Sequence, residues 1–219
     1  MASDWMIQDG MFIDVHSELR SFDDVRALLE VVEATFSLKK YFNGNNLGGR
    51  WIFQVFSREF VLDVADVANR IIAESGRTGP ILEVMSGDGM LATFLRPFVD
   101  RELIATDAKS PRFRIAYPKE VETLSCLDAV DKHDPALVIA CWEPFLSTDC
   151  IDIVNQQIPM IWIGEPLSCG HPDLFSGEYG TGEHITLGSP YAIGRHDSLL
   201  QDDRRTDVFL FNCDREWLK

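Results

Sequence analysis

The sequence predicts an α/β protein, in which a mostly parallel sheet covered by helices on both faces follows an N-terminal helical cap. From Ile81 onward, short apolar runs alternate with amphipathic stretches, a pattern typical of strand–helix–strand units. A glycine turn, Ser86–Gly89, directly follows the first apolar run and opens a helix-like stretch. Because glycine admits a ligand close to the backbone, we expect a binding site at the carboxyl ends of the parallel strands.

The N-terminal third is predicted to be helical. Ser21 precedes two acidic residues, which is typical of a helix N-cap, and apolar residues then recur at helical spacing up to Phe36. An aromatic segment, 51–60, leads into a second amphipathic stretch that Gly76 is expected to end. We therefore expect a helical cap or lid at residues 1–76 and the sheet domain at residues 77–219.

The remaining elements follow in order. Parallel strands are predicted at Ile81–Met85, Leu103–Thr106, Val121–Leu124, Ala136–Cys141 and Pro159–Gly164. A helix is expected at 148–157, and an antiparallel hairpin at 198–200 and 208–211. Residues 167–195 hold six of the fifteen glycines without clear periodicity. A loop of this length is typically functional, and we expect it to leave the ligand-binding edge.

Composition narrows the functional classes. The net charge of −15 disfavours binding to nucleic acid, whose backbone attracts clustered Lys and Arg. No apolar run approaches the roughly 20 residues that a membrane span needs, and the start lacks a signal-peptide pattern, so we expect a cytoplasmic protein without membrane contact. The five cysteines form no C-x-x-C pair, and the Cys and His spacing matches no zinc pattern, so no metal site is predicted.

The charges around the glycine turn discriminate between ligands. Glu83 lies inside the strand before the turn, and Asp107 ends the next strand. The pattern Gly87-x-Gly89-x-x-Ala92 also fits a dinucleotide site, but Glu83 and the turn's own Asp88 would oppose a pyrophosphate. A cationic ligand that carries a ribose suits these carboxylates better, with Asp107 accepting hydrogen bonds from the ribose hydroxyls.

Together, Glu83, Gly87 and Gly89 resemble the first motif of class I methyltransferases that depend on S-adenosylmethionine (SAM). Met85 stands where that motif usually has its first glycine. The resemblance implies a seven-stranded, Rossmann-like methyltransferase sheet with an antiparallel C-terminal hairpin. It also implies SAM as cofactor and methyl transfer to an oxygen or nitrogen of a small molecule.

The resemblance also assigns roles to residues. The cofactor-binding candidates are Glu83, Met85, Gly87, Gly89, Asp107, Leu127, Asp128 and Cys141, with Leu127 and Asp128 at the adenine. The catalytic candidates are Glu143, His171 and His184, and the substrate-binding candidates are Trp142, Trp51, Tyr41 and Glu165. The segment 141–145 lacks the Asn/Asp-Pro-Pro-Tyr/Phe form, which argues against base nitrogens and glutamine amides as acceptors.

Two other functions remain open. Met85 and the lack of a recognisable catalytic residue are compatible with a catalytically inactive, methyltransferase-like partner subunit. The second open function is a transferase that uses the same sulfonium cofactor for another reaction, such as aminopropyl transfer. No pattern names the acceptor, and a homodimer is left open.

Overall fold

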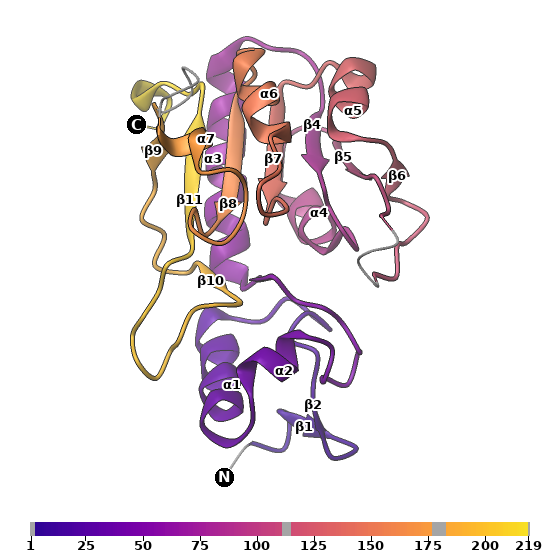
Figure 1. Ribbon diagram of the computed structural model, residues 1–219, viewed down its shortest axis with the longest axis vertical. Coiled ribbons are helices and arrows are strands. Elements are labelled where there is room, and N and C mark those ends of the chain that lie inside the picture. The colour runs from indigo at the N-terminus through magenta and orange to yellow at the C-terminus, as the bar shows by residue number, and fades with distance from the viewer. Residues whose placement is uncertain (1–2, 111–114, 177–182, 219) are drawn as a thin grey trace. The chain divides into compact units, whose positions relative to one another are not determined.

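The computed structural model describes residues 3–110, 115–176 and 183–218 (Figure 1). Contacts divide the chain into two compact units. The N-terminal unit consists of Met1–Val61 and Pro190–Thr206, and the sheet unit of Leu62–Ser189 and Asp207–Lys219. This division differs from the expected boundary at residue 76, because it falls inside a helix and returns a late segment to the N-terminal unit.

The sheet unit is built on a seven-stranded sheet with the order β6-β5-β4-β7-β8-β11-β9. Its strands are β4 (Ile81–Val84), β5 (Leu103–Asp107), β6 (Glu122–Thr123), β7 (Leu137–Cys141), β8 (Met160–Gly164), β9 (Ile185–Thr186) and β11 (Asp207–Phe211). The strands from β6 to β8 are parallel, whereas β11 runs antiparallel to both β8 and β9. The predicted fold class, a mostly parallel methyltransferase sheet with antiparallel strands at its end, is confirmed.

Helices cover both faces of this sheet. They are α3 (Arg58–Ser75), α4 (Met90–Leu95), α5 (Cys126–His133), α6 (Asp149–Asn155) and α7 (Asp173–Ser176), with short 3-10 turns at Arg96–Phe98 and Arg215–Leu218. Figure 1 shows α5 and α6 in front of the sheet and α3 behind it. This two-sided cover explains why every residue of β4 and β8 is buried, and why β8 is a continuous apolar run.

One predicted element is wrong. Residues 198–200 form no strand, and the short strand at the sheet edge that pairs with β11 is β9. The reason is a distant carboxylate: Glu33 accepts hydrogen bonds from the Ser198 hydroxyl at 2.5 Å and from the Leu199 amide at 3.0 Å. These contacts satisfy polar groups that a strand would pair, and they hold the segment in the N-terminal unit.

The N-terminal unit combines short strands with two helices. Its elements are β1 (Ile7–Gln8), β2 (Met11–Phe12), α1 (Phe22–Thr35), α2 (Leu38–Phe42), β3 (Gln54–Val55) and β10 (Ile193–Gly194). Ser21 caps α1 by accepting a hydrogen bond from the Asp24 amide, as predicted. The buried face of α1 packs with Phe42, Ile52 and Ile193 in one apolar core.

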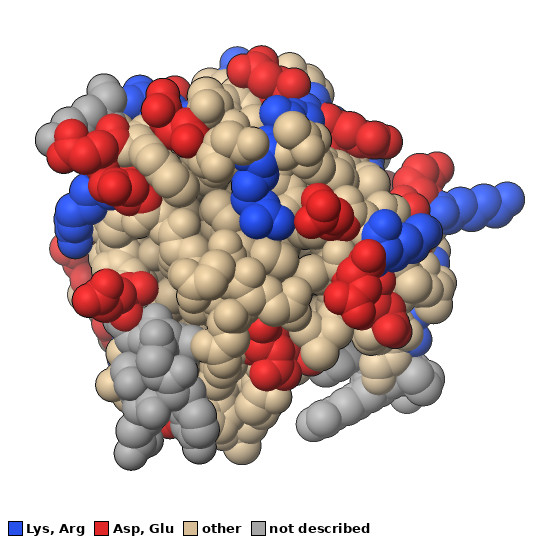
Figure 2. Space-filling model, turned by 90° about the horizontal axis from the view of Figure 1, so that it is seen from above, with Lys and Arg blue, Asp and Glu red and all other residues tan. Residues whose placement is uncertain are grey.

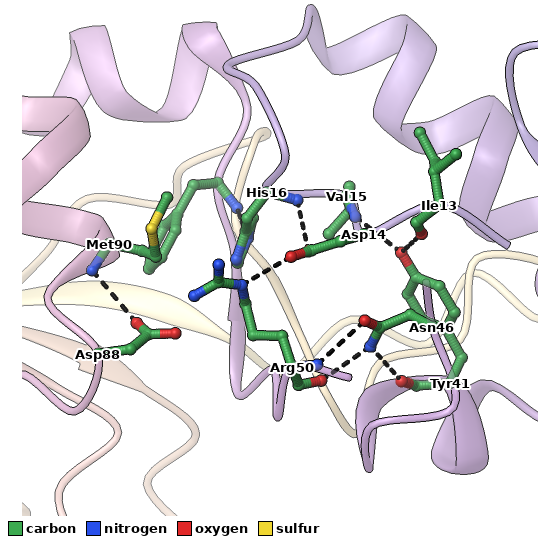
Figure 3. A network of polar contacts seen from close by, with 10 residues as sticks. Ile13, Asp14, Val15, His16, Tyr41, Asn46, Arg50, Asp88 and Met90 are labelled. Carbon is green, nitrogen blue, oxygen red and sulfur yellow. Dashed lines mark hydrogen bonds and ion pairs between the residues drawn. The ribbon is translucent and has the colours of Figure 1, made fainter. Parts of the chain in front are cut away.

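A buried polar network supports this core (Figure 3). Asp14 accepts hydrogen bonds from the His16 amide at 2.9 Å and from Nε of Arg50 at 2.7 Å. His16 is 4% exposed, stacks on Phe56, and accepts the Phe56 amide at Nε2 over 3.1 Å. Burial lowers the pKa of His16 from 6.5 to about 4, although neighbouring Asp14 opposes the shift.

No helix among the described residues has the length and apolar character needed to cross a membrane.

Acid is expected to destabilise the protein through His16. Between pH 6.5 and about 4, His16 is protonated in the unfolded chain but stays neutral in the folded protein. The free energy of unfolding therefore falls as the pH falls through this window. The slope is at most about 1.4 kcal/mol per pH unit. A His16→Gln variant keeps an acceptor for the Phe56 amide but does not titrate, so its unfolding free energy should fall less than that of wild type.

Urea unfolding at pH 7 and pH 5 measures this difference. His196→Gln, the same change at an exposed residue of the same unit, is the control. Equal pH dependence in the wild type and the His16→Gln variant would contradict the assignment.

Candidate functional site

The candidate site lies where the strand order reverses. From β4 the chain proceeds outward to β5 and β6 on one side, and then returns to β7 and β8 on the other. Ligands of open α/β sheets bind at the carboxyl ends of the strands at this switch point. The strand ends that meet there are Val84, Asp107, Cys141 and Gly164.

The backbone bends sharply just past these ends. Met85 has φ 54°, Lys109 has φ 52° and Trp142 has φ 57°. Residues other than glycine seldom adopt positive φ, and such strained positions gather at functional sites. The observation therefore favours this edge of the sheet as the functional one.

The glycine turn forms as the sequence predicts. Gly87 and Gly89 have φ 57° and 69°, and the Gly89 amide donates to the Ser86 carbonyl at 2.9 Å. Gly89 is also the N-cap of α4. A Cβ on Gly89 would lie 2.9 Å from Cγ2 of Val121, so a larger residue would displace the neighbouring chain. Both glycines have a left-handed backbone that glycine adopts without strain.

Asp107 joins this turn to the end of β5. Its Oδ2 accepts the Gly87 amide at 2.9 Å, and its Oδ1 accepts the Lys109 amide at 2.6 Å. The side chain is half-buried. Because the Tyr117 hydroxyl also hydrogen-bonds to this carboxylate, one of its four lone pairs remains for a ligand. Sequence and structure thus bring Asp107 and the glycine turn together.

Two further residues of this region were not predicted. The hydroxyl of Tyr117 hydrogen-bonds to Asp107, and burial together with that carboxylate raises the pKa of Tyr117 to about 12. The buried Oγ of Ser86 has no hydrogen-bond partner among the described residues. Its position inside the glycine turn could have identified it as a candidate from the sequence. A buried hydroxyl without a protein partner indicates that a ligand or water forms its hydrogen bond.

Glu83 is buried beneath the turn and is 2% exposed. Its Oε2 accepts the Ala92 amide at 3.0 Å, in the first turn of α4. Burial raises the pKa of Glu83 to about 8, against the Ala92 hydrogen bond that lowers it. The carboxyl group therefore supports the helix that the glycine turn begins. The thiol of Cys141, on the adjacent strand, has its pKa raised by burial and by Glu83.

Met85 is half-buried and follows β4 directly. Its left-handed backbone is the conformation that a glycine would adopt without strain. The chain thus keeps the glycine geometry of the motif while carrying a side chain there.

Glu143 is enclosed at the end of β7, with 1% exposure. Its carboxylate accepts the Cys150 amide at 3.1 Å and the Trp162 indole N–H at 3.3 Å, and burial raises its pKa. Neighbouring Trp142 is 9% exposed. A carboxylate held in this way anchors the start of α6, and the structure does not present it to a substrate.

The adenine candidates lie at the start of α5. Asp128 is exposed, and its carboxylate accepts the Ser125 hydroxyl at 2.6 Å in a capping arrangement. Leu127 is half-buried beside it. Asp128 therefore has a local structural use, and its exposed side chain remains reachable by a ligand.

The candidate residues that follow β8 in the sequence lie apart from one another. His171 contacts Asp173, accepting its amide at Nδ1 over 3.2 Å. His184 lies beside Phe211, which pairs with Met160 at the start of β8, so it is at the opposite end of that strand from Gly164. Glu165 directly follows Gly164 and is 2% exposed. The structure does not bring these three side chains to one point.

Trp51 and Tyr41 belong to the N-terminal unit. Tyr41 has no exposed surface, and its hydroxyl donates to the Ile13 carbonyl at 2.8 Å while accepting the Val15 amide at 2.9 Å. It is a core residue rather than a substrate contact. Trp51, in contrast, is 42% exposed.

Alkaline pH is expected to destabilise the sheet unit through Glu83. From pH 4.5 to about 8 the folded carboxyl group holds a proton that the unfolded one has lost, so stability falls as the pH rises, by at most about 1.4 kcal/mol per pH unit. Glu83→Gln keeps an acceptor for the Ala92 amide and should unfold with a flatter profile in this range. Thermal unfolding at pH 5 and pH 8 measures this difference, and Glu120→Gln, at an exposed residue, is the control. An equal pH dependence of stability in the wild type and Glu83→Gln would refute the role of Glu83.

No protein-family model matches the chain, and no curated protein matches its sequence. Similar solved structures include a ribosomal protein L11 methylase from Lactobacillus delbrueckii subsp. bulgaricus, with 15% identity, 69% of this chain and 76% of that chain covered, and a TM-score of 0.39. A putative SAM-dependent methyltransferase from Streptococcus mutans has 14% identity, coverage of 67% and 47%, and a TM-score of 0.38. Human N-acetylserotonin methyltransferase in complex with SAM has 10% identity, coverage of 70% and 54%, and a TM-score of 0.34.

Structural similarity at this level of identity and TM-score says nothing about the activity of this chain. The strand order and strand directions are those expected of a class I methyltransferase sheet, and this chain has that fold.

Proposed function

We propose that the protein binds SAM at the carboxyl ends of β4 and β5 and transfers its methyl group to an oxygen or nitrogen of a small molecule. The observation that carries the proposal is the contact between Asp107 and the Gly87 amide at the switch point of the sheet. It places a ribose-accepting carboxylate directly against a turn whose two glycines admit a ligand to the backbone.

The charges at this turn favour a cation over a pyrophosphate. Burial is the main cause of the raised pKa of Glu83, and the carboxylates of Asp88 and Asp107 raise it further, so negative charge lies near the turn. A sulfonium ligand without phosphate suits this field, whereas a dinucleotide would meet repulsion.

The residues that would hold the cofactor follow from these contacts. The glycine turn and the unpartnered Ser86 hydroxyl would receive its methionine portion, Asp107 its ribose, and the exposed start of α5 with Leu127 and Asp128 its adenine. When bound, the cofactor supplies a methyl group activated by the sulfonium. The protein's contribution is to position the acceptor in line with that group and to exclude water.

The source of a general base is narrowed by the structure. Glu143 is enclosed and hydrogen-bonded, and His184 is at the far end of β8 from the site. Glu165 is as buried as Glu143, so His171, which follows β8, is the remaining candidate for an acceptor that needs deprotonation. An acceptor that is already nucleophilic would need positioning alone.

A small acceptor is the class that the chain's charge favours. With a net charge of −15, the chain has no surplus of cations for a nucleic-acid backbone. On the face seen in Figure 2, acidic and basic side chains are interspersed, and the described residues form no continuous basic surface there.

A partner subunit without turnover is the second candidate function. Met85 supports it, because a side chain that points toward the ligand from the glycine position would narrow the space beside the turn. Binding of SAM distinguishes the two candidates, since a partner subunit with a closed site would bind neither SAM nor its demethylated product.

Asp107→Asn should weaken the binding of SAM and S-adenosylhomocysteine by about tenfold or more, because it removes a charged acceptor from the ribose hydroxyls. Calorimetric titration measures the effect, with NADH as the competing ligand class and Asp134→Asn as a matched control at an exposed aspartate of the same unit. Wild-type protein that binds NADH but not SAM would refute the cofactor assignment.

Met85→Gly should tighten the binding of S-adenosylhomocysteine, because glycine adopts the observed backbone without strain and removes a side chain from the edge of the turn. Gln157→Gly relieves the same strain at an exposed residue with φ 60°, just before β8, and should leave binding unchanged. Unchanged or weaker binding by Met85→Gly would show that the Met85 side chain points away from the ligand.

A further inference from the structure

The N-terminal unit presents a small polar and aromatic surface. We call the side chains of Asn43, Trp51, Phe53 and Arg195 the arginine face. Asn43 and Trp51 are antiparallel bridge partners, and Gln54 of β3 pairs with Gly194 of β10. The Arg195 amide continues this pairing by donating to the Phe53 carbonyl at 2.9 Å.

Backbone pairing and side-chain contacts connect the four residues. Residues directly opposite in an antiparallel pair share a face, which applies to the bridge partners Asn43 and Trp51. The Arg195 guanidinium then joins Asn43 to the Phe53 ring, because it hydrogen-bonds to the Asn43 side chain and lies over that ring. Ile52, between Trp51 and Phe53, is buried in the core with 1% exposure.

Arg195 is held on this face without a counter-charge. Its Nη2 donates to Oδ1 of Asn43 at 2.5 Å, and its Cζ lies 4.4 Å from the centre of the Phe53 ring. Among the described residues no carboxylate forms an ion pair with it, whereas Arg50 of the same unit is paired with Asp14. Partial burial lowers the pKa of Arg195, with no acidic neighbour opposing the shift. A half-buried cation of this kind is stabilised by an anion.

The geometry leaves binding groups available. A guanidinium that stacks on a ring keeps the N–H groups of its edge for a carboxylate or phosphate, which it binds through two parallel hydrogen bonds. Trp51 is 42% exposed and offers a flat apolar surface on the same face. The surface thus combines a charged donor with a stacking platform.

We propose that the arginine face binds a small oxyanion that carries a planar group, such as an aromatic carboxylate or an aryl phosphate ester. Arg195 receives the oxyanion, and Trp51 stacks on the planar group. The site belongs to the N-terminal unit alone and does not depend on the proposed function.

Benzoate and phenyl phosphate are the probes, and neutral benzamide is the control ligand. Calorimetric titration of the full chain should show saturable binding of at least one oxyanion and much weaker binding of benzamide. Arg195→Gln should weaken the oxyanion by about tenfold or more, because the charge-assisted hydrogen bonds are lost. Arg204→Gln removes the same charge from an exposed arginine of the same unit and should leave the affinity unchanged.

The preference between the two oxyanions identifies the ligand chemistry, and either preference supports the site. Binding by neither oxyanion, or equal binding by Arg195→Gln and Arg204→Gln, would overturn it. Trp51→Leu should reduce the affinity for benzoate while leaving acetate binding unaffected, and equal losses for both would remove the stacking role.

Asn43→Asp provides a test that does not depend on the folding of an arginine variant. The aspartate supplies Arg195 with a carboxylate within the fold, so oxyanion binding should fall by about tenfold or more while the melting temperature rises. Undiminished benzoate binding by this variant would contradict the proposal.

Discussion

The Asp107 carboxylate is the interaction on which the rest of the site depends. Its two oxygens hold the Gly87 amide and the Lys109 amide, so that the turn after β4 and the turn after β5 are tied to one side chain. This fixes the glycine turn at the place where the parallel strands diverge. The turn in turn begins α4, whose first residues depend on the left-handed Gly89. A ligand that engages Asp107 would therefore meet a surface formed by both strand ends.

Buried carboxyl groups support this edge from beneath. Glu83 accepts the Ala92 amide inside α4, and Glu143 accepts the Cys150 amide inside α6. In each case the side chain on the strand satisfies a backbone donor in the first turn of the following helix, which has no partner within the helix itself. The two glutamates that the sequence marks as chemical candidates thus act first as helix anchors. Burial disfavours the charged form of each carboxyl group, which is the physical reason for their raised pKa values.

The sequence predicted the parts of the fold that local patterns control. Strands β4, β7 and β8 begin and end within one residue of their predicted bounds, because buried strands read as continuous apolar runs. The juxtaposition of Asp107 and the glycine turn was predictable for a similar reason, since both follow parallel strands directly.

Long-range contacts account for what the sequence did not reveal. Glu33 and Ser198 are 165 residues apart, and their hydrogen bond replaces the expected strand at 198–200. Tyr41 was a reasonable lid residue by type, but its burial depends on accepting the Val15 amide from another segment. Tyr117 escaped notice because nothing in its neighbourhood indicates that its hydroxyl meets Asp107.

Arg195 has an unusual environment in an acidic chain. The chain has 35 acidic and 20 basic residues, and several of its arginines form ion pairs with carboxylates. Arg50, for example, is paired with the buried Asp14. Arg195 is instead held by a neutral amide and an aromatic ring, both of which orient the guanidinium without neutralising it. An orientation maintained without a counter-ion costs stability when no anion is bound, and that cost is recovered only by a ligand. The opposite charges of the two sites, carboxylates at the glycine turn and a guanidinium on the arginine face, therefore fit two different ligands.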